Sequence, residues 1–422
     1  MVTSNHLVAS PDAPPLAVRP GHYLYVGGSD IFNRFNQPAQ HLPLHWAKHI
    51  ERLDLIGYNT FYDGPPASRF HRLYEGLSNV LKKHRRVTIT QEGKIRRIAV
   101  RRLRLPGLID PLIQDLWICT IVRKHLAPYY DIGIVHDPES ALLARWLKRS
   151  RRVGLLAYHD IDYYPYVRSR WQKTIAWRER LVVRDSDAVI SVSRPLVKLR
   201  KEQGAKKVLY LPNGVNFMRF SEANRRREAA GARPPTLIYS GTLDLRWGAD
   251  LPLQAMPSLL QHVPEARLLI AGTGPAEDEL KALSQSLGLG EAVSFLGMVP
   301  YRDLPSVMAN ADVGLATSRE DIFRHYASPL KIIEYMAAGL PVICSGGGEA
   351  ELMIDESKGG INIAFLPDSF VQAAQVLLTK PTELAARRQA AIAYASSRSW
   401  ERLGEQLAEF LLQLAGHAGY LN

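Results

Sequence analysis

The sequence predicts an α/β protein with two doubly wound, Rossmann-like domains that face each other across a cleft. The first observation is length, because 422 residues exceed what one hydrophobic core usually serves. The second is a β-then-α rhythm that occurs twice along the chain. The third is that the expected strands are apolar throughout rather than alternating, as in parallel sheets buried on both faces.

The first series of strands and helices predicts an N-terminal domain over residues 21–220, after a flexible, proline-rich tail at 1–20. Its first strand ends in Gly27-Gly28, where the lack of side chains lets a ligand approach the backbone, although a plain tight turn is the alternative. A helical stretch near Gln37–Arg52 follows. The expected strands are His22–Gly27, Ile132–His136, Val153–Tyr158, Ala188–Val192 and Val208–Leu211.

The second series predicts a C-terminal domain over residues 236–395. Residues 220–235 are rich in Arg, Glu, Ala, Gly and Pro and show no apolar period, so they are the expected domain junction. The last residues, 396–422, are expected to form a helix that packs back on the N-terminal domain. The expected strands are Thr236–Tyr239, Arg267–Ala271, Val293–Leu296, Val313–Ala316 and Pro341–Cys344.

Composition limits the compartment and the chemistry. Apolar residues make up 46% and charged residues 22%, as in soluble folded proteins. Two cysteines, Cys119 and Cys344, predict neither a disulfide framework nor a cysteine zinc site. The N-terminus does not read as a secretory signal, and no apolar run reaches the roughly 18 residues of a spanning helix. We expect a cytoplasmic protein, soluble or attached at the surface of the membrane.

The net charge of +12 is concentrated in a basic cluster between Lys82 and Arg104, with ten basic residues and one acidic residue, Glu92. Such a cluster attracts anionic lipid or nucleic acid. The apolar segment 105–122, which carries Trp117, follows and favours docking on an anionic membrane surface. The alternative is a core helix at 112–122 beside a solvated charged face. No motif for specific nucleic-acid recognition accompanies the charge.

The segment 328–345 has the pattern of a helix start, a helix stop and a buried strand. Pro329 suits the first helical position, and Gly339 suits the position just past the helix end. Backbone N–H groups near Ser328, Pro329, Leu330 and Lys331, with the Lys331 ammonium, are expected to hold a diphosphate. Glu334, about one turn on, can accept the hydroxyls of a ribose. The alternative is an ordinary surface helix with a solvated glutamate.

The order of motifs around this segment resembles the retaining GT-B glycosyltransferases of the large family that includes sucrose synthase and bacterial mannosyltransferases. The matching segments are Asp187–Ser193, Leu211–Val215, Tyr239–Leu243 with Gly248, Leu268–Pro275, Val293–Gly297 and Asn310–Ser318. The resemblance implies the GT-B fold and a phosphate loop that includes Gly241 and Thr242. It places Gly274 in a second donor-side loop, which lacks the complete glycine fingerprint of NAD-binding proteins.

By the same resemblance, His159 matches a histidine that touches the donor sugar, with Asp160 beside it. These two residues are the expected catalytic pair. An alternative is that Asp160 and Asp162 hold a divalent ion, as in GT-A glycosyltransferases. The two-domain layout favours the GT-B interpretation, for which neither a metal nor a cofactor is expected besides the nucleotide-sugar donor.

The sequence departs from the family pattern at three places. Tyr326 stands where the first of two glutamates is usual, which puts the sugar-facing carboxylate in doubt. Thr242 and Trp247 stand where an arginine and a lysine are usual. Because the leaving diphosphate gains negative charge, its charge must still be balanced. Arg246 and Lys331 are the expected cations.

The resemblance implies transfer of a sugar, with retention, from a nucleoside diphosphate to a lipid-linked or polysaccharide acceptor. The reaction is expected at the cytoplasmic face of the membrane, in exopolysaccharide or cell-envelope glycan synthesis. Two alternatives stay open. One is a GT-B-fold nucleotide-sugar epimerase, and the other is a basic nucleic-acid-binding protein.

Overall fold

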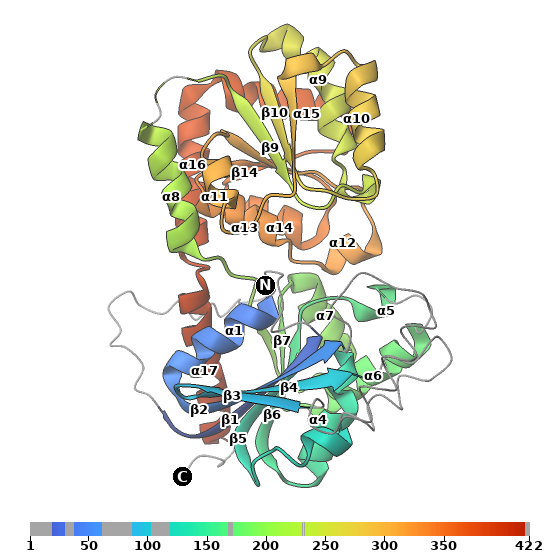
Figure 1. Ribbon diagram of the computed structural model, residues 1–422, viewed down its shortest axis with the longest axis vertical. Helices are drawn as coiled ribbons and strands as arrows, with labels where there is room; N and C mark the ends of the chain where they lie inside the picture. The colour runs from blue at the N-terminus through green and yellow to red at the C-terminus, as the bar shows by residue number, and fades with distance from the viewer. Residues whose placement is uncertain are drawn as a thin grey trace.

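The computed structural model describes residues 19–29, 38–60, 87–102, 119–167, 172–229, 231 and 233–417. These residues form two domains stacked end to end, each built on its own sheet with helices on the faces (Figure 1). The chain completes the N-terminal domain, passes through the C-terminal domain and returns to the first in its last helix.

The N-terminal sheet has eight strands among the described residues, in the order β3-β4-β2-β1-β5-β6-β7-β8. Neighbouring strands are parallel except β3 and β4, which form an antiparallel hairpin. The strands are β1 (Arg19–Ser29), β2 (Ile50–Thr60), β3 (Val87–Glu92), β4 (Ile95–Arg102), β5 (Tyr130–His136), β6 (Val153–Asp160), β7 (Ala188–Ser191) and β8 (Val208–Tyr210). The helices are α1 (Pro38–Trp46), α4 (Ala141–Arg149), α5 (Tyr164–Val167), α6 (Gln172–Asp185) and α7 (Arg194–Glu202), with 3-10 turns Ala47–His49 and Pro138–Ser140.

The C-terminal sheet has six parallel strands in the order β11-β10-β9-β12-β13-β14. The strands are β9 (Thr236–Ser240), β10 (Arg267–Ala271), β11 (Val293–Gly297), β12 (Val313–Ala316), β13 (Val342–Cys344) and β14 (Gly360–Asn362). The helices are α8 (Phe217–Ala229), α9 (Asp250–His262), α10 (Glu277–Ser286), α11 (Leu304–Met308), α12 (Ile322–Tyr326), α13 (Leu330–Ala337), α14 (Gly348–Ser357), α15 (Pro367–Thr379) and α16 (Pro381–Ser396), with 3-10 turns Leu245–Trp247 and Gly290–Ala292.

The predicted fold class is confirmed, and every strand expected from the sequence overlaps an observed one. The strand order reverses between β1 and β5 in the first sheet and between β9 and β12 in the second. In a doubly wound fold, ligands bind beyond the carboxyl ends of the strands at such a switch point. The loops after β9, β12 and β13 are therefore where a site is expected in the second domain.

The expected junction at 220–235 is wrong in its local structure, because helix α8 covers Phe217–Ala229. Phe220 and Ala223 form a buried face that packs on the C-terminal domain. Arg227 is buried on the same side and donates hydrogen bonds to the carbonyls of Ala311 and Ala338, at 2.6 and 3.0 Å. Because Arg227 occupies a buried position of α8 with a charged side chain, the sequence of this helix does not show an apolar period.

The last helix, α17 (Trp400–His417), belongs to the core of the N-terminal domain. It packs against α1, and the ring of Trp400 stacks on His41 at 5.3 Å between centroids. The two chain crossings between the domains are paired, since Val215 donates to Arg398 O and Trp400 donates to Val215 O at 3.1 and 3.2 Å. The return crossing therefore ties both domains together.

The described part of the basic cluster is a sheet edge rather than a uniformly solvated face. Within it, Arg96 forms an ion pair with buried Asp54 of β2, with Nε 2.9 Å from Oδ1. Tyr130 donates to the other oxygen at 2.6 Å. Burial raises the pKa of Asp54, but hydrogen bonds from His22, Arg96 and Tyr130 outweigh burial and hold it below its usual range. Lys82–Arg86, Arg104 and Trp117 lie outside the described residues.

We predict that Arg96→Ser lowers the free energy of unfolding of the N-terminal domain by about 3 kcal/mol, because it leaves the Asp54 carboxylate buried without its cation. Arg97 provides the matched control, since its partner Glu92 at 2.8 Å is exposed. Arg97→Ser should change stability by less than about 1 kcal/mol. Urea unfolding followed by circular dichroism measures both. Equal losses of stability in the two variants would show that the buried Arg96–Asp54 ion pair contributes no more than the exposed Arg97–Glu92 pair.

Candidate functional site

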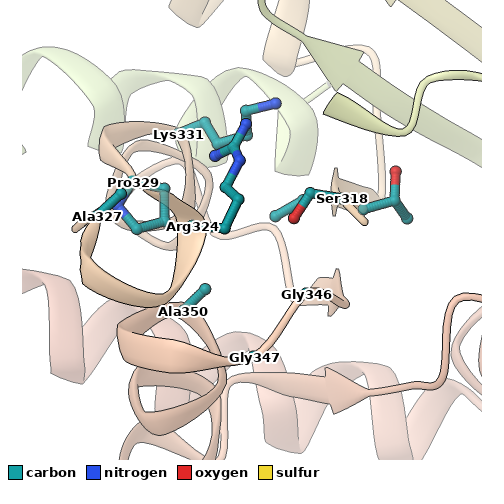
Figure 2. A pocket seen from close by; sticks show the side chains of 10 residues that line it. Ser318, Arg324, Ala327, Pro329, Lys331, Gly346, Gly347 and Ala350 are labelled. Atoms are coloured by element: carbon teal, nitrogen blue, oxygen red, sulfur yellow. The ribbon is translucent and has the colours of Figure 1, made fainter. Parts of the chain in front are cut away.

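A pocket lies beyond the carboxyl ends of β12 and β13, at the side of the C-terminal domain that faces the N-terminal domain. Its volume is about 330 Å³, counting space open to solvent. Figure 2 shows Arg324 and Lys331 on one wall, and Ser318, Gly346 and Gly347 on the others. The lining residues are Ala316, Thr317, Ser318, Arg324, Ala327, Pro329, Lys331, Gly346, Gly347 and Ala350.

Helix α13 opens at this pocket. It begins at Leu330, one residue later than predicted, because Pro329 has an extended backbone with φ −73° and ψ 119°. The N–H groups of a first helical turn have no intrahelical partner, and they carry the positive end of the helix dipole. Gly339 follows the helix end with φ +72°, as predicted. The helix start is therefore suited to an anion.

Lys331 enters the pocket from the first turn of α13 (Figure 2). Its Nζ lies 4.2 Å from the ring centroid of Tyr239, a cation–π contact. Burial lowers the pKa of Lys331 to about 7, and the charge of Arg324 adds to the decrease. Gly241 lies against the same ammonium, since a Cβ there would come within 3.2 Å of Nζ. The structure thus brings the predicted residues Gly241 and Lys331 together.

Arg324 is the second cation of the pocket, and the sequence interpretation missed it. Its guanidinium carbon lies 3.2 Å from the ring centroid of Trp247, and its Nε is buried without a hydrogen-bond partner among the described residues. Burial lowers the pKa of Arg324 to about 10. A buried N–H that lacks an acceptor is costly, so the position favours an anionic or polar ligand. The only sequence signal is a cation seven residues before Lys331.

Arg246 does not line this pocket, although it lies near Arg324, with its guanidinium carbon 5.9 Å from the ring centroid of Trp247. Its side chain is 66% exposed and forms an ion pair with Asp244 at 2.8 Å. Of the two arginines near Trp247, Arg324 lines the pocket and Arg246 does not. Trp247, which stands where the family usually has a lysine, supplies the ring under the Arg324 guanidinium. Trp247 and Arg324 therefore belong to one local arrangement.

Three consecutive glycines follow Ser345 after β13, and the first two of them, Gly346 and Gly347, line the pocket. Gly346, Gly347 and Gly348 have φ of +105°, +69° and +66°. A Cβ on Gly346 would lie 2.2 Å from the hydroxyl oxygen of Ser318, and one on Gly348 would lie 2.5 Å from His325 O. The loop needs glycine for both backbone conformation and close packing. The run of three glycines directly after a buried strand was a sequence signal that we overlooked.

The other residues predicted to bind the donor differ in burial and in their distance from the pocket. Glu334 is buried on α13, one turn after Lys331, and Ser328 is buried just before the helix. Thr242 is exposed next to Gly241. A Cβ on Gly274 would lie 2.3 Å from Leu243 O, so this glycine is required by loop packing. Neither Thr242 nor Gly274 lines the pocket. Within β1, Gly27 is buried near the carboxyl end, and Gly28 follows it.

His159 is the last residue but one of β6 in the N-terminal domain and is buried. Its Nδ1 lies 2.8 Å from the hydroxyl oxygen of Tyr25. Burial, with the neighbouring His136, lowers the pKa of His159 well below its usual value. The imidazole is therefore neutral at physiological pH and is oriented by Tyr25.

The predicted catalytic role of Asp160 is not supported by its surroundings. Both carboxylate oxygens accept hydrogen bonds from the buried guanidinium of Arg200, at 2.7 and 2.8 Å, and Ser191 donates to one of them. Arg200 also pairs with Glu179 at 2.7 Å. Asp160 is thus a member of a buried ion-pair network. The described residues contain no group of three or more side chains that could hold a metal ion. Because Asp160 is bonded to Arg200 through both oxygens, it is poorly placed to hold an ion together with Asp162.

The two domains meet beside the pocket. Ser193 Oγ of the N-terminal domain donates to Tyr326 O at 2.6 Å, and Asn213 Nδ2 donates to Ser328 O at 2.7 Å. Glu349, which follows the glycine loop, accepts a hydrogen bond from the backbone N–H of Arg194 at 2.7 Å. Residues of the first domain therefore hold the segment that leads into α13.

Family models match most of the chain. A model described as "Glycosyl transferase 4-like domain" matches residues 68–214, and one described as "Glycosyl transferases group 1" matches residues 220–398. The boundary between the matches falls where α8 begins. Both matched descriptions are those of glycosyltransferase domains.

Curated relatives include mannosyltransferases. The GDP-mannose-dependent alpha-(1-6)-phosphatidylinositol monomannoside mannosyltransferase of Mycolicibacterium smegmatis is 31% identical over 244 residues, 55% of this chain and 64% of that protein. The putative glycosyltransferase EpsD of Bacillus subtilis is 26% identical over 336 residues, 72% of this chain and 82% of that protein. The chain spans 55 to 64% of the length of the mannosyltransferases named for phosphatidylinositol acceptors that it matches.

Solved structures share the fold over nearly the whole chain. Sucrose-phosphate synthase from Thermosynechococcus elongatus superimposes with a TM-score of 0.69 at 19% identity, covering 94% of this chain and 100% of that one. HepE from Anabaena, solved with UDP and glucose, gives a TM-score of 0.63 at 19% identity, covering 92% and 99%. With the two family matches and the paired parallel sheets, these findings confirm the family predicted from the motifs: the chain belongs to the GT-B glycosyltransferases with group 1 and 4-like domains.

Proposed function

We propose that this protein transfers a sugar, with retention of configuration, from a nucleoside diphosphate donor to a lipid-linked or polysaccharide acceptor. The observation that carries the proposal is the convergence of Lys331 and Arg324 on one pocket at the start of α13. Two cations and a positive helix end are what a diphosphate requires. The N-terminal domain would receive the acceptor.

The same groups suit the chemical step. As the bond between sugar and diphosphate breaks, the leaving nucleoside diphosphate gains negative charge, and preorganised cations stabilise that charge. Lys331 and Arg324 would hold this charge without moving, because the rings of Tyr239 and Trp247 fix their side chains. Glu334, one turn further on, is our candidate for the ribose hydroxyls.

The acceptor class is argued from relatives. Several relatives are named for mannosyl transfer to phosphatidylinositol mannosides, and one for a putative glycosyltransferase, EpsD. The lipid-linked acceptor is carried over from these names by analogy. A polysaccharide acceptor, the cytoplasmic face, and exopolysaccharide or cell-envelope glycan synthesis stay predictions from the sequence. The comparisons favour neither an epimerase nor a nucleic-acid-binding protein. Labelled nucleotide-sugar separates the enzymes, since a transferase passes label to an acceptor and an epimerase returns rearranged sugar.

We predict that the affinity for GDP or UDP falls about five- to tenfold between pH 7.5 and 8.5, because the unliganded Lys331 loses its proton above its pKa of about 7 and the diphosphate binds the charged form. Calorimetric titration of the purified chain measures this slope. Lys331→Gln should bind more weakly and show no such slope, whereas Lys281→Gln on exposed α10 should behave like the wild type. A slope that persists in Lys331→Gln would assign the proton elsewhere, and no binding of any nucleoside diphosphate would reject the proposed function.

Membrane attachment through the basic cluster is a second part of the proposal. No helix within the described residues is long and apolar enough to cross a membrane. Replacing Arg97, Arg101 and Arg102 by Ser should weaken binding to anionic vesicles by about 3 kcal/mol, about 1 kcal/mol for each charge. Arg96 is kept because it pairs with Asp54.

Vesicle flotation at several salt concentrations tests this prediction. The matched control removes three exposed arginines of the C-terminal domain, Arg225, Arg226 and Arg302. Wild type and control should float at low salt and release as salt screens the charges. If the triple variant of the cluster floats as well as the control, the membrane proposal fails.

A further inference from the structure

Asp162 is a half-buried carboxyl that neither the fold nor the pocket described above uses. It follows β6 by two residues, at the edge of the N-terminal sheet that faces the C-terminal domain. Unlike Asp160, it forms no hydrogen bond or ion pair within the part of the chain that the structure describes. A carboxyl that is partly removed from water without a hydrogen-bond partner among the described residues is costly, so its position calls for an explanation.

The surroundings of Asp162 belong to both domains. The next residue, Tyr163, packs its ring against Tyr326 of α12 at 4.7 Å between centroids, and Tyr166 stacks on Phe323 of the same helix at 6.2 Å. These contacts hold the loop after β6 against the helix that sends Arg324 into the pocket. Arg324 lies on α12 between the two residues that contact this loop, Phe323 and Tyr326. Burial, with the charge of Asp160, raises the pKa of Asp162 to about 7, and the charge of Arg324 opposes this rise.

We propose that the Asp162 carboxyl accepts hydrogen bonds from hydroxyl groups of the sugar that the donor carries. The inference rests on the proposed function, because it takes the diphosphate to lie on Lys331 and Arg324. A sugar attached to that diphosphate would be the next group along the ligand, and Arg324 is the pocket cation whose charge reaches Asp162. A carboxylate can accept hydrogen bonds from sugar hydroxyl groups.

Asp162 would thus compensate for an unusual feature of this chain. Tyr326, which stands at the position of the usual sugar-facing glutamate, has its ring against Tyr163 and its carbonyl bonded to Ser193 Oγ. The phenol hydroxyl of a tyrosine can accept a hydrogen bond, but it lacks the charge and the paired oxygens with which a carboxylate accepts two hydroxyls. The contact with Tyr163 instead holds the neighbouring Asp162 at the same interface. The carboxyl would then come from the N-terminal domain rather than from α12.

The test compares affinities for a nucleotide and for the matching nucleotide-sugar, measured calorimetrically on the full chain with GDP and GDP-mannose and with UDP and UDP-glucose. Asp162→Asn should leave the affinity for the nucleoside diphosphate within about twofold and weaken the nucleotide-sugar about ten- to a hundredfold. Asp162→Glu should retain most of the difference that the wild type shows between its affinity for the nucleotide-sugar and its affinity for the nucleoside diphosphate. Asp368→Asn, the same change on exposed α15, should affect neither. Melting temperatures without ligand check that each variant folds.

The outcomes separate the inference from the proposed function. If Asp162→Asn binds the nucleotide-sugar as well as the wild type, Asp162 does not contact the sugar. If it weakens both ligands equally, Asp162 acts on the phosphate cations and the inference is overturned. Failure of the wild type to bind any nucleoside diphosphate would reject the donor pocket itself, and the inference with it.

Discussion

The pocket depends on hydrogen bonds that the N-terminal domain makes to the chain between α12 and α13. Ser193 holds the carbonyl of Tyr326, and Asn213 holds that of Ser328, so the residues before α13 are fixed by a domain to which they do not belong. Glu349 extends this interface, since it accepts from Arg194 N and from the hydroxyl of Tyr210. The start of α13, and with it Lys331, is positioned by contacts between domains rather than by the second domain alone.

Two buried cations in one pocket are unfavourable without a ligand. Both are removed from water. Burial, with the charge of Arg324, lowers the pKa of Lys331 to about 7, and burial, with the charge of Arg246, lowers the pKa of Arg324 to about 10. The faces of Tyr239 and Trp247 offset part of this cost through cation–π contacts. An anion would relieve the rest. A site that is strained when empty and balanced when filled is typical of binding sites with perturbed pKa values.

The sequence predicted what local patterns encode. Apolar runs located ten of the fourteen strands among the described residues, and the proline and glycine at either end of α13 located that helix to within one residue. The strands β2, β3, β4 and β14 were missed, and in β4 charged side chains such as Arg96 interrupt the apolar pattern. In the structure that charge is balanced by Asp54, 42 residues away in the chain.

Site residues were likewise predicted where a local motif marks them. Lys331 and Gly241 belong to recognisable motifs, and the structure places them together. Asp160 looked catalytic because no local pattern reveals its partner, Arg200, 40 residues away. Arg324 was missed because its role depends on Trp247, which lies on another loop. Such pairings between distant segments are set by tertiary packing, which periodicity and spacing do not record.

The central claim is that Arg324, and not Arg246, joins Lys331 in holding the donor diphosphate. Calorimetric titration of GDP and UDP into Arg324→Gln and Arg246→Gln tests it most directly, with melting temperatures to confirm that both variants fold. The account predicts that Arg324→Gln loses about tenfold or more in affinity for whichever nucleotide the wild type binds, because a charged contact is removed, while Arg246→Gln stays within about twofold. A large loss in Arg246→Gln with wild-type affinity in Arg324→Gln would contradict it.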